Sequence, residues 1–239
     1  MRITFSLLLT LLWISGYAQT KFQHSITIGY NIGGLAPTSL PDNIRKINHY
    51  SPGFSPSLGY ELIYHTGSKW AIGSGLNIGF KNMQVIDSVQ YFHTQVSVDD
   101  AFVEGDFSGT NTTRVKNLYL SVPVYASYQL GEAWRFKLGV YLSRLISPSF
   151  SGSVSDGYLR KGDSFGEKIT INEASFDFSD RQRKIDFGLL GGAERLVWNQ
   201  LAVRAELQWG LVPVFPGSFK GISFKMYNIF ANLGLAYHF

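Results

Sequence analysis

The sequence predicts an all-β fold: an eight-stranded antiparallel up-and-down transmembrane β-barrel with short periplasmic turns and long extracellular loops. Three observations support this prediction. Apolar and polar residues alternate over long segments, the connections between these segments are alternately long and short, and tryptophans gather beside the short connections. No stretch after the amino-terminal region approaches roughly eighteen unbroken apolar residues, which excludes a helical membrane protein.

The last segment, residues 226–239, is the clearest strand. Its sequence MYNIFANLGLAYHF places large apolar residues on one face and small or polar residues on the other, with Phe230 as the exception. A strand that crosses a tilted bilayer path needs about 9 to 11 residues in the hydrocarbon. This segment is therefore long enough to cross a membrane.

Seven earlier segments repeat the alternation. They are residues 21–33, 54–64, 70–80, 117–129, 134–142, 185–194 and 201–211. Pro123 lies within one of them and cannot donate a hydrogen bond to a neighbouring strand, so a bulge or a skipped ladder bond is expected there.

The connections alternate strictly between long and short. Residues 65–68, 130–133 and 198–200 form tight turns, whereas residues 84–113 and 147–183 are expected to be long irregular loops. Alternate connections of an up-and-down barrel lie at the same end, so all the tight turns share one rim. Trp70, Trp134 and Trp198 lie beside these turns and predict an aromatic girdle at a membrane interface. The alternative is a soluble sandwich whose tryptophans cap a core, but such a fold has no reason to sort its loops in this way.

If the apolar faces meet lipid, the opposite faces fill the barrel. They carry charges of both signs, which should pair because an unpaired buried charge is costly. The predicted interior ion-pair network comprises Glu61, Arg135, Lys137, Asp186, Glu194, Arg204 and Glu206. A regulated path for a solute or proton is the alternative role for these residues. Open diffusion is not expected, because side chains fill an eight-stranded barrel.

The amino terminus predicts a signal peptide over residues 1–18, followed by one barrel domain over residues 19–239. Arg2, an apolar core and the small residues before Ala18 fit cleavage after Ala18. The chain has no cysteine, so no disulfide framework is expected. The formal charge of +4 is scattered along the chain, which argues against a nucleic-acid partner.

Three motifs resemble the PorT-like outer-membrane β-barrel family, also described as the outer membrane protein beta-barrel domain or "porin family" proteins. They are YLSVPVY followed by YQLG over residues 119–131, DFGLLGGAE over residues 186–194, and the terminal AYHF. The resemblance implies an integral outer-membrane protein, surrounded by outer-membrane lipid and inserted by the barrel-assembly machinery, which reads the last strand. Tyr237 and Phe239 would then be the assembly signal. Some members resemble a secretion accessory.

The first expectation for function is a non-enzymatic structural or accessory role in the envelope, including assistance to protein secretion with envelope or secretion proteins as partners. The alternative is surface recognition or adhesion through the long outer loops, which predicts that deletions around residues 98–109 or 152–166 abolish activity.

An outer-membrane hydrolase ranks lower. His24 and Ser25 are adjacent and so point to opposite faces of a strand, and nothing fixes the spacing of His49, His93, Asp99 and Asp100. The five histidines lack metal-ligand spacing and no calcium-loop pattern occurs, so neither a metal nor a cofactor is expected.

Overall fold

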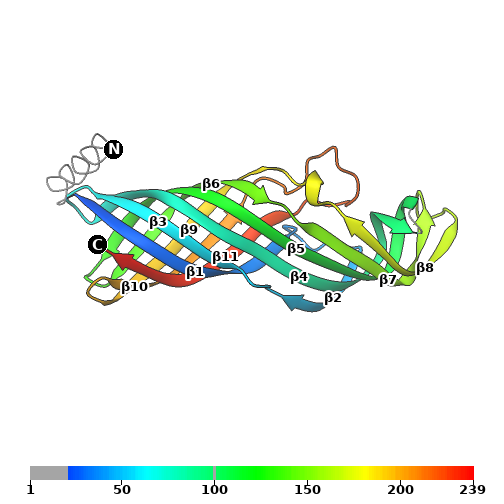
Figure 1. The fold of residues 1–239 in the computed structure, drawn as a ribbon, viewed down its shortest axis with the longest axis horizontal. Helices are drawn as coiled ribbons and strands as arrows, with labels where there is room; N and C mark the ends of the chain where they lie inside the picture. The colour runs from blue at the N-terminus through cyan, green and yellow to red at the C-terminus, as the bar shows by residue number, and fades with distance from the viewer. Residues whose placement is uncertain (1–20, 99–100) are drawn as a thin grey trace, which may run out of the picture.

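The computed structural model describes residues 21–98 and 101–239, which form one antiparallel sheet of 11 strands and a short 3-10 helix (Figure 1). The strands are β1 (Phe22–Ala36), β2 (Ile44–Ser51), β3 (Pro56–His65), β4 (Trp70–Val98), β5 (Ala101–Leu130), β6 (Trp134–Ser147), β7 (Phe150–Lys161), β8 (Lys168–Asp177), β9 (Ile185–Trp198), β10 (Leu201–Gly210) and β11 (Tyr227–His238). The helix is η1 (Ser179–Arg181). The all-β antiparallel prediction is confirmed. The predicted signal peptide lies outside the described residues.

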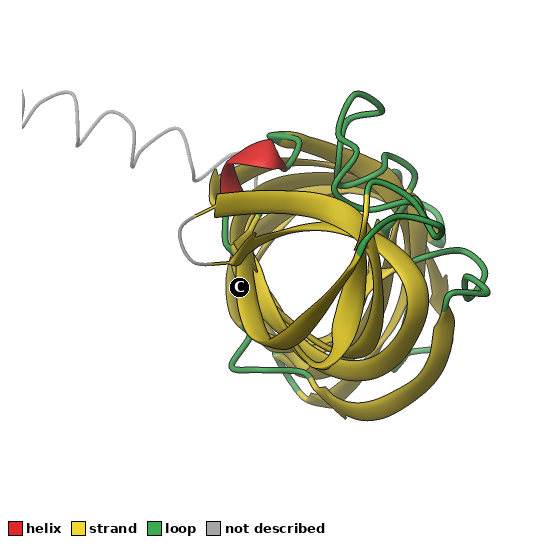
Figure 2. Ribbon diagram, turned by 90° about the vertical axis from the view of Figure 1, so that its right-hand side faces the viewer, coloured by secondary structure: helices red, strands yellow, loops and turns green. Residues whose placement is uncertain are grey.

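Eight of these strands pair in a closed ring, in the order β1, β3, β4, β5, β6, β9, β10, β11 and back to β1. The first and last strands of the chain complete the ring, with Ser25 opposite His238 and Ala36 opposite Tyr227. Figure 2 looks along the axis of this ring. The predicted total of eight strands is wrong, because the described chain also contains β2, β7 and β8.

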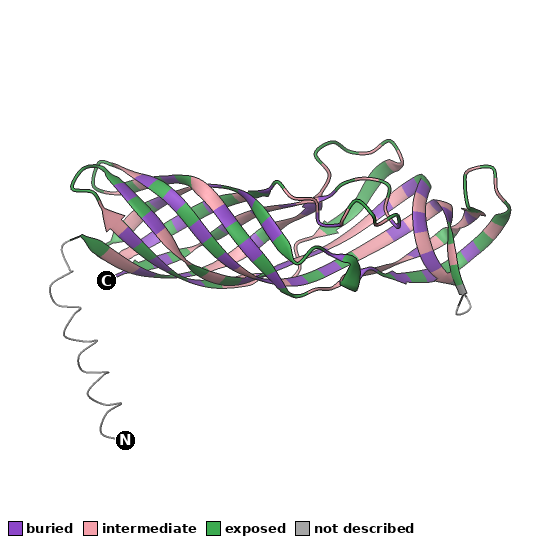
Figure 3. Ribbon diagram, turned by 90° about the horizontal axis from the view of Figure 1, so that it is seen from above, coloured by how far each residue is buried: buried purple, intermediate pink, exposed green. Residues whose placement is uncertain are grey.

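Side chains alternate strictly across the wall of the ring, as the buried and exposed bands in Figure 3 show. On β4, Ile72 and Ile78 are 56% and 43% exposed, whereas Gly73 and Gly79, which follow them directly, face the buried interior. Large apolar side chains therefore cover the outside of the ring and polar ones fill it, as the alternation predicts.

Two strands continue far beyond the ring. β4 has 29 residues and β5 has 30, whereas β10 has 10. Their outer parts (residues 81–98 and 101–116) pair with each other, β2 pairs with β4, β7 pairs with β5, and β8 pairs with β7. We call this assembly the outer arm. One further pair, Ser97 with Ser175, joins β4 to β8.

The outer arm corrects the prediction of irregular loops over residues 84–113 and 147–183. The alternation continues there, but the apolar residues now mainly occupy the inward-facing positions and the polar residues the outward-facing ones. Phe80 is exposed on the outside of the ring, while Met83 and Val89 point inward and are buried. A strand that leaves lipid for water must turn its apolar face from the outside to the inside.

The outer arm accordingly encloses an apolar core of its own. Phe92, Phe107, Phe150 and Phe176 belong to it, and the connection between β10 and β11 packs Phe215 against Phe150 with ring centroids 5.0 Å apart. No helix in residues 21–98 or 101–239 is long and apolar enough to cross a membrane.

The expected irregularity at Pro123 is confirmed. The β4–β5 register passes from Ser74 opposite Val124 directly to Asn77 opposite Ser121. The Ser74 hydroxyl donates a hydrogen bond to the Pro123 carbonyl at 2.9 Å.

Candidate functional site

Four charged side chains meet in the interior of the ring, contributed by three strands. Arg204 on β10 donates to Glu61 at 2.8 Å and to Glu206 at 2.7 Å. Lys137 on β6 lies 2.8 Å from Glu206 and 3.4 Å from Glu61. All four are buried. Two carboxylates and two cations thus balance one another, which the low dielectric of the interior requires.

Tyr125 on β5 completes this cluster. Its hydroxyl donates to the second oxygen of Glu61 at 2.6 Å, and Lys137 Nζ lies 4.9 Å from the centre of its ring. The ring occupies the space above Gly73, where an added Cβ would lie 2.4 Å from Tyr125 Cζ. Glycine on β4 therefore makes room for the tyrosine that orients Glu61.

A second charged group lies nearer the tight turns. Glu194 on β9 contacts Arg135 at 3.4 Å and His238 at 2.8 Å, and His238 also contacts the Ser25 hydroxyl at 2.7 Å. Arg135 donates further to Gln23 at 2.9 Å. This group joins β1, β6, β9 and β11, so it lies across the contact that closes the ring.

Asp186 lies apart from both groups. It accepts hydrogen bonds from Tyr141 and Asn228, each at 3.0 Å. Nearby, the buried Lys81 ammonium lies 5.1 to 5.4 Å from the ring centres of Tyr141, Tyr119 and Phe230. It has no hydrogen-bond partner among the described residues. Phe230, the exception in the alternation of the last strand, therefore points inward to stack on this cation.

The structure thus brings six of the seven predicted interior charges into two groups and leaves Asp186 in a third. Sequence reasoning missed Lys81, Tyr125 and His238. Lys81 could have been found from the point at which the alternation inverts, and His238 from its position on the polar face of the last strand. Two small cavities among these groups each measure about 10 Å³, a size that suits a single water molecule.

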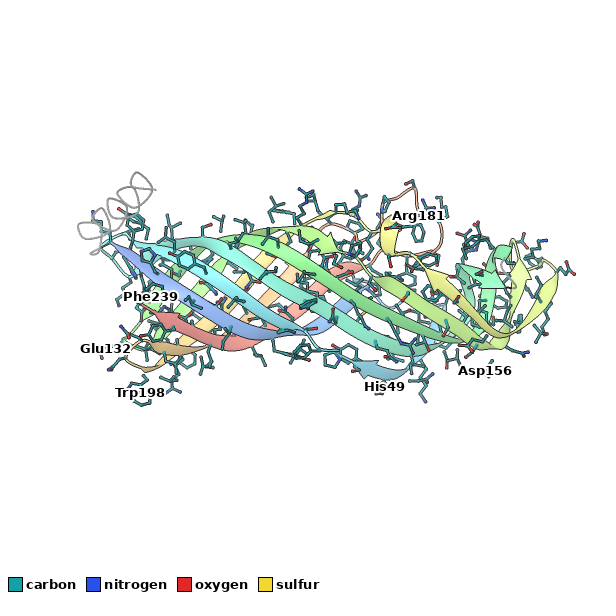
Figure 4. The ribbon with its side chains drawn as sticks, in the orientation of Figure 1. His49, Glu132, Asp156, Arg181, Trp198 and Phe239 are labelled. Atoms are coloured by element: carbon teal, nitrogen blue, oxygen red, sulfur yellow. The ribbon has the colours of Figure 1, made fainter. Side chains whose placement is uncertain are left out.

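The predicted girdle tryptophans lie at the tight-turn end of the ring, where Figure 4 labels Trp198 together with Glu132 and Phe239. Trp70, Trp134 and Trp198 are all exposed, and Trp70 packs on Tyr128 at 5.0 Å. Tyr237 and Phe239 are exposed at the same end, with their rings 6.3 Å apart. The interface and assembly roles of these residues remain predictions.

His93 forms a separate polar site on the outer arm, outside the ring. Its two ring nitrogens contact Asp106 at 2.9 Å and Glu104 at 3.1 Å. Burial alone would lower the pKa of His93, but the hydrogen bonds with these carboxylates outweigh burial and raise it above its ordinary value.

Among residues 21–98 and 101–239, the histidines considered for metal and hydrolase chemistry lie on separate strands. No group of three or more His, Cys, Asp or Glu side chains there could hold a metal ion. His24 stacks on Phe239 at the tight-turn end, while His49 lies on β2 and His93 on the outer arm. Asp99 and Asp100 lie outside the described residues.

Comparison with known proteins gives a family match and weaker structural likenesses. A family model described as outer membrane protein beta-barrel domain matches residues 17–216. No protein of curated function matches the sequence. The chain is similar to the crystal structure of Ail, the attachment invasion locus protein of Yersinia pestis, with a TM-score of 0.38 at 12% identity over 92% of this chain and 100% of Ail.

The structure of Ail in a phospholipid bilayer nanodisc gives a TM-score of 0.33 at 15% identity over 91% of this chain and 99% of that one. OmpT of Vibrio cholerae gives 0.18 at 10% identity, over 91% and 97% of the two chains. The family model covers most of the chain, the strands close into a ring, and the ring is apolar outside and polar inside. The chain therefore belongs to the outer membrane protein beta-barrel domain family and is an outer-membrane protein.

Proposed function

We propose that this protein is a non-enzymatic surface-recognition protein, in which the eight ring strands span the outer membrane and the outer arm binds a partner outside the cell. The tight turns, with Trp70, Trp134 and Trp198, would face the periplasm. Residues 1–18 would act as the signal peptide, and outer-membrane lipid and the barrel-assembly machinery would be the partners during insertion. The proposal rests on one observation, the length and the ordered packing of the outer arm.

The arm is far larger than a membrane crossing needs. A bilayer requires about 9 to 11 residues per strand, while β4 and β5 have 29 and 30. If the connection between β4 and β5 only had to join the two strands, a short flexible loop would be sufficient. The arm instead has paired strands and a continuous apolar core, so it holds a fixed surface away from the lipid.

β2 gives that surface an available strand edge. Among the described strands, β2 pairs only with β4. Six of its eight residues are exposed, and they include Arg45, Lys46 and His49. An exposed edge can add a strand from another chain, with main-chain hydrogen bonds giving affinity and side chains giving specificity. The basic side chains favour an acidic partner segment.

An accessory role in secretion is the competing proposal, and it rests on the resemblance of the motifs to the PorT-like family. It predicts that exported proteins collect in the periplasm when the chain is missing. Recognition through the outer arm predicts unchanged export.

The decisive variant reverses the charge of the exposed β2 edge of the outer arm with Arg45→Glu and Lys46→Glu. The matched control makes the same change at the opposite end of the ring with Lys21→Glu and Lys69→Glu, which are also exposed. Cells displaying each form are tested for binding to matrix proteins, immobilised glycans and sister cells, and their surface and secreted proteins are compared.

Loss of binding in the arm variant alone, with normal amounts of folded barrel, supports recognition. Equal binding by both forms contradicts it. Loss of exported proteins from the surface when the whole chain is deleted would favour the secretion role instead.

A further inference from the structure

The outer arm contains a cavity of about 350 Å³ on its concave side. Its walls come from the end of β1, from β2, β4, β5, β7 and β8, and from the connection before β11. Apolar groups dominate the lining, with Met83 and Met226 among them. The volume lies at the lower end of the range of about 300 to 1,000 Å³ that is usual for small-molecule sites.

One part of this apolar wall is polar. Asp87 on β4 and Asn111 on β5 are both 4% exposed and line the cavity. The Asn111 amide donates to Asp87 at 2.9 Å, while Asn111 Oδ1 is buried without a hydrogen-bond partner among the described residues. The ion pairs of the described chain do not include Asp87. One buried acceptor, Asn111 Oδ1, therefore lacks a donor, and the adjacent Asp87 carboxylate has an amide donor but no cation.

The β1–β2 connection and the β10–β11 connection both contribute lining residues to the cavity. Leu40, on the first connection, is 56% exposed and lines the cavity. The two connections are linked by a hydrogen bond from the Asn43 amide to the Ser223 hydroxyl at 3.2 Å. This exposed hydrogen bond lies outside the apolar core, and the exposed Leu40 gives the cavity a route to the surface.

We propose that the cavity binds a small amphiphile with an alkyl-like body and a hydrogen-bond-donating head of the amine type. The apolar walls take the body, and Asp87 and Asn111 Oδ1 accept from the head. An ammonium group satisfies both acceptors and neutralises the carboxylate. A fatty carboxylate of the same length offers no donor and places a second negative charge beside Asp87.

Methionine methyl groups provide the test. The chain has three methionines, Met1, Met83 and Met226, and the latter two line the cavity. The protein is labelled with [methyl-13C]methionine, placed in phospholipid nanodiscs and titrated at pH 7.5 with octylamine, 1-octanol or octanoate. We expect saturable shifts of both cavity methyl signals, with octylamine binding about tenfold or more tightly than octanoate.

Three variants make the result specific. Asp87→Asn should remove the preference for octylamine over octanol, while Glu173→Gln, an exposed carboxylate on β8, should keep it. Val85→Trp, which fills the cavity, should weaken the binding of octylamine and of octanol. Folding of each variant is checked by heat-modifiable migration in gels.

Shifts that grow linearly with ligand and persist in Val85→Trp would mean partition into the bilayer and would overturn the proposal. So would equal affinity for octylamine and octanoate, or no shift at all.

Discussion

Glu61 lies at the centre of the four-residue charged cluster inside the ring. It accepts from Arg204 at 2.8 Å and from Tyr125 at 2.6 Å, and it lies 3.4 Å from Lys137. Glu61→Gln leaves two buried cations with one carboxylate, Glu206. Loss of one partner from a buried ion pair costs about 3 to 5 kcal/mol. We expect the free energy of unfolding, measured by urea titration in lipid vesicles, to fall by about that amount.

Glu132→Gln is the matched control for this prediction, since Glu132 is exposed in a tight turn. It should change the free energy of unfolding by less than about 0.5 kcal/mol. Equal losses in the two variants would show that the interior pairing is not what stabilises the ring.

Asp87 and His93 make the outer arm sensitive to pH in the same direction. Burial raises the pKa of Asp87 from 3.8 to about 6, against the lowering effect of its hydrogen bond with Asn111. The unfolded arm therefore loses this proton at lower pH than the folded arm, and stability falls as the pH rises from about 4 to about 6. The raised pKa of His93 adds stability that is complete below 6.5 and disappears as the pH rises through its folded pKa.

We expect the arm to be more protected at pH 5 than at pH 8. Hydrogen exchange of peptides from residues 83–98 and 101–116, corrected for intrinsic rates, measures this difference. Asp87→Asn should remove the part of the change between pH 4 and 6, and His93→Gln the part above pH 6.5. Protection that does not vary with pH in the unchanged chain would contradict both assignments.

At the scale of the strand, β11 ends by closing the ring. The Phe239 N–H donates to the His24 carbonyl at 2.9 Å, and the Phe239 carbonyl accepts from the His24 N–H at 3.3 Å. Deletion of Phe239 removes both bonds and the predicted assembly signal. The amount of folded barrel in the outer membrane should fall several-fold, while Phe239→Tyr should assemble normally. Normal assembly of the truncated chain would count against the proposed signal.

The strands of the ring could be predicted from the sequence because lipid outside and charges inside impose a simple alternation. Residues 70–80 follow it with one exception, the outward-facing Ser74, and the outward positions of residues 117–129 follow it throughout. The strands of the arm were missed because the same rule inverts in water. Asp87, Glu104 and Asp106 lie there, and acidic residues are depleted in strands.

Pairing inside the ring was only partly accessible from the sequence. Alternation places Glu61, Lys137 and Arg204 on inner faces, but it does not give the stagger between strands that brings them together. The cavity beside Asp87 depends on the packing of six strands and of the connections before β2 and β11, which local patterns do not report.

At the scale of the whole molecule, the chain combines two bodies with opposite solvent preferences. The ring is apolar outside and charged inside, whereas the outer arm has an apolar core. Figure 1 shows the arm extending from one end of the ring. The bilayer would shield the ring from proteases while the arm stays accessible at its turns.

Brief proteinase K treatment of intact cells should therefore cut first near residues 162–167, an exposed turn between β7 and β8, and leave the ring as a protected core. The fragments are identified by mass spectrometry. First cleavage at residues 66–69 or 131–133 would place the tight turns outside the cell and contradict the proposed orientation.

The closed ring also sets a kinetic order for folding. The contact between Ser25 and His238 joins residues 213 positions apart, whereas β4 and β5 meet through a hairpin in which Val98 pairs with Ala101. The entropy of loop closure delays distant pairings relative to local ones. Closure of β1 on β11 is therefore the last and slowest step. Until it occurs, the chain exposes two unpaired strand edges, and its lifetime in that state decides between insertion and aggregation.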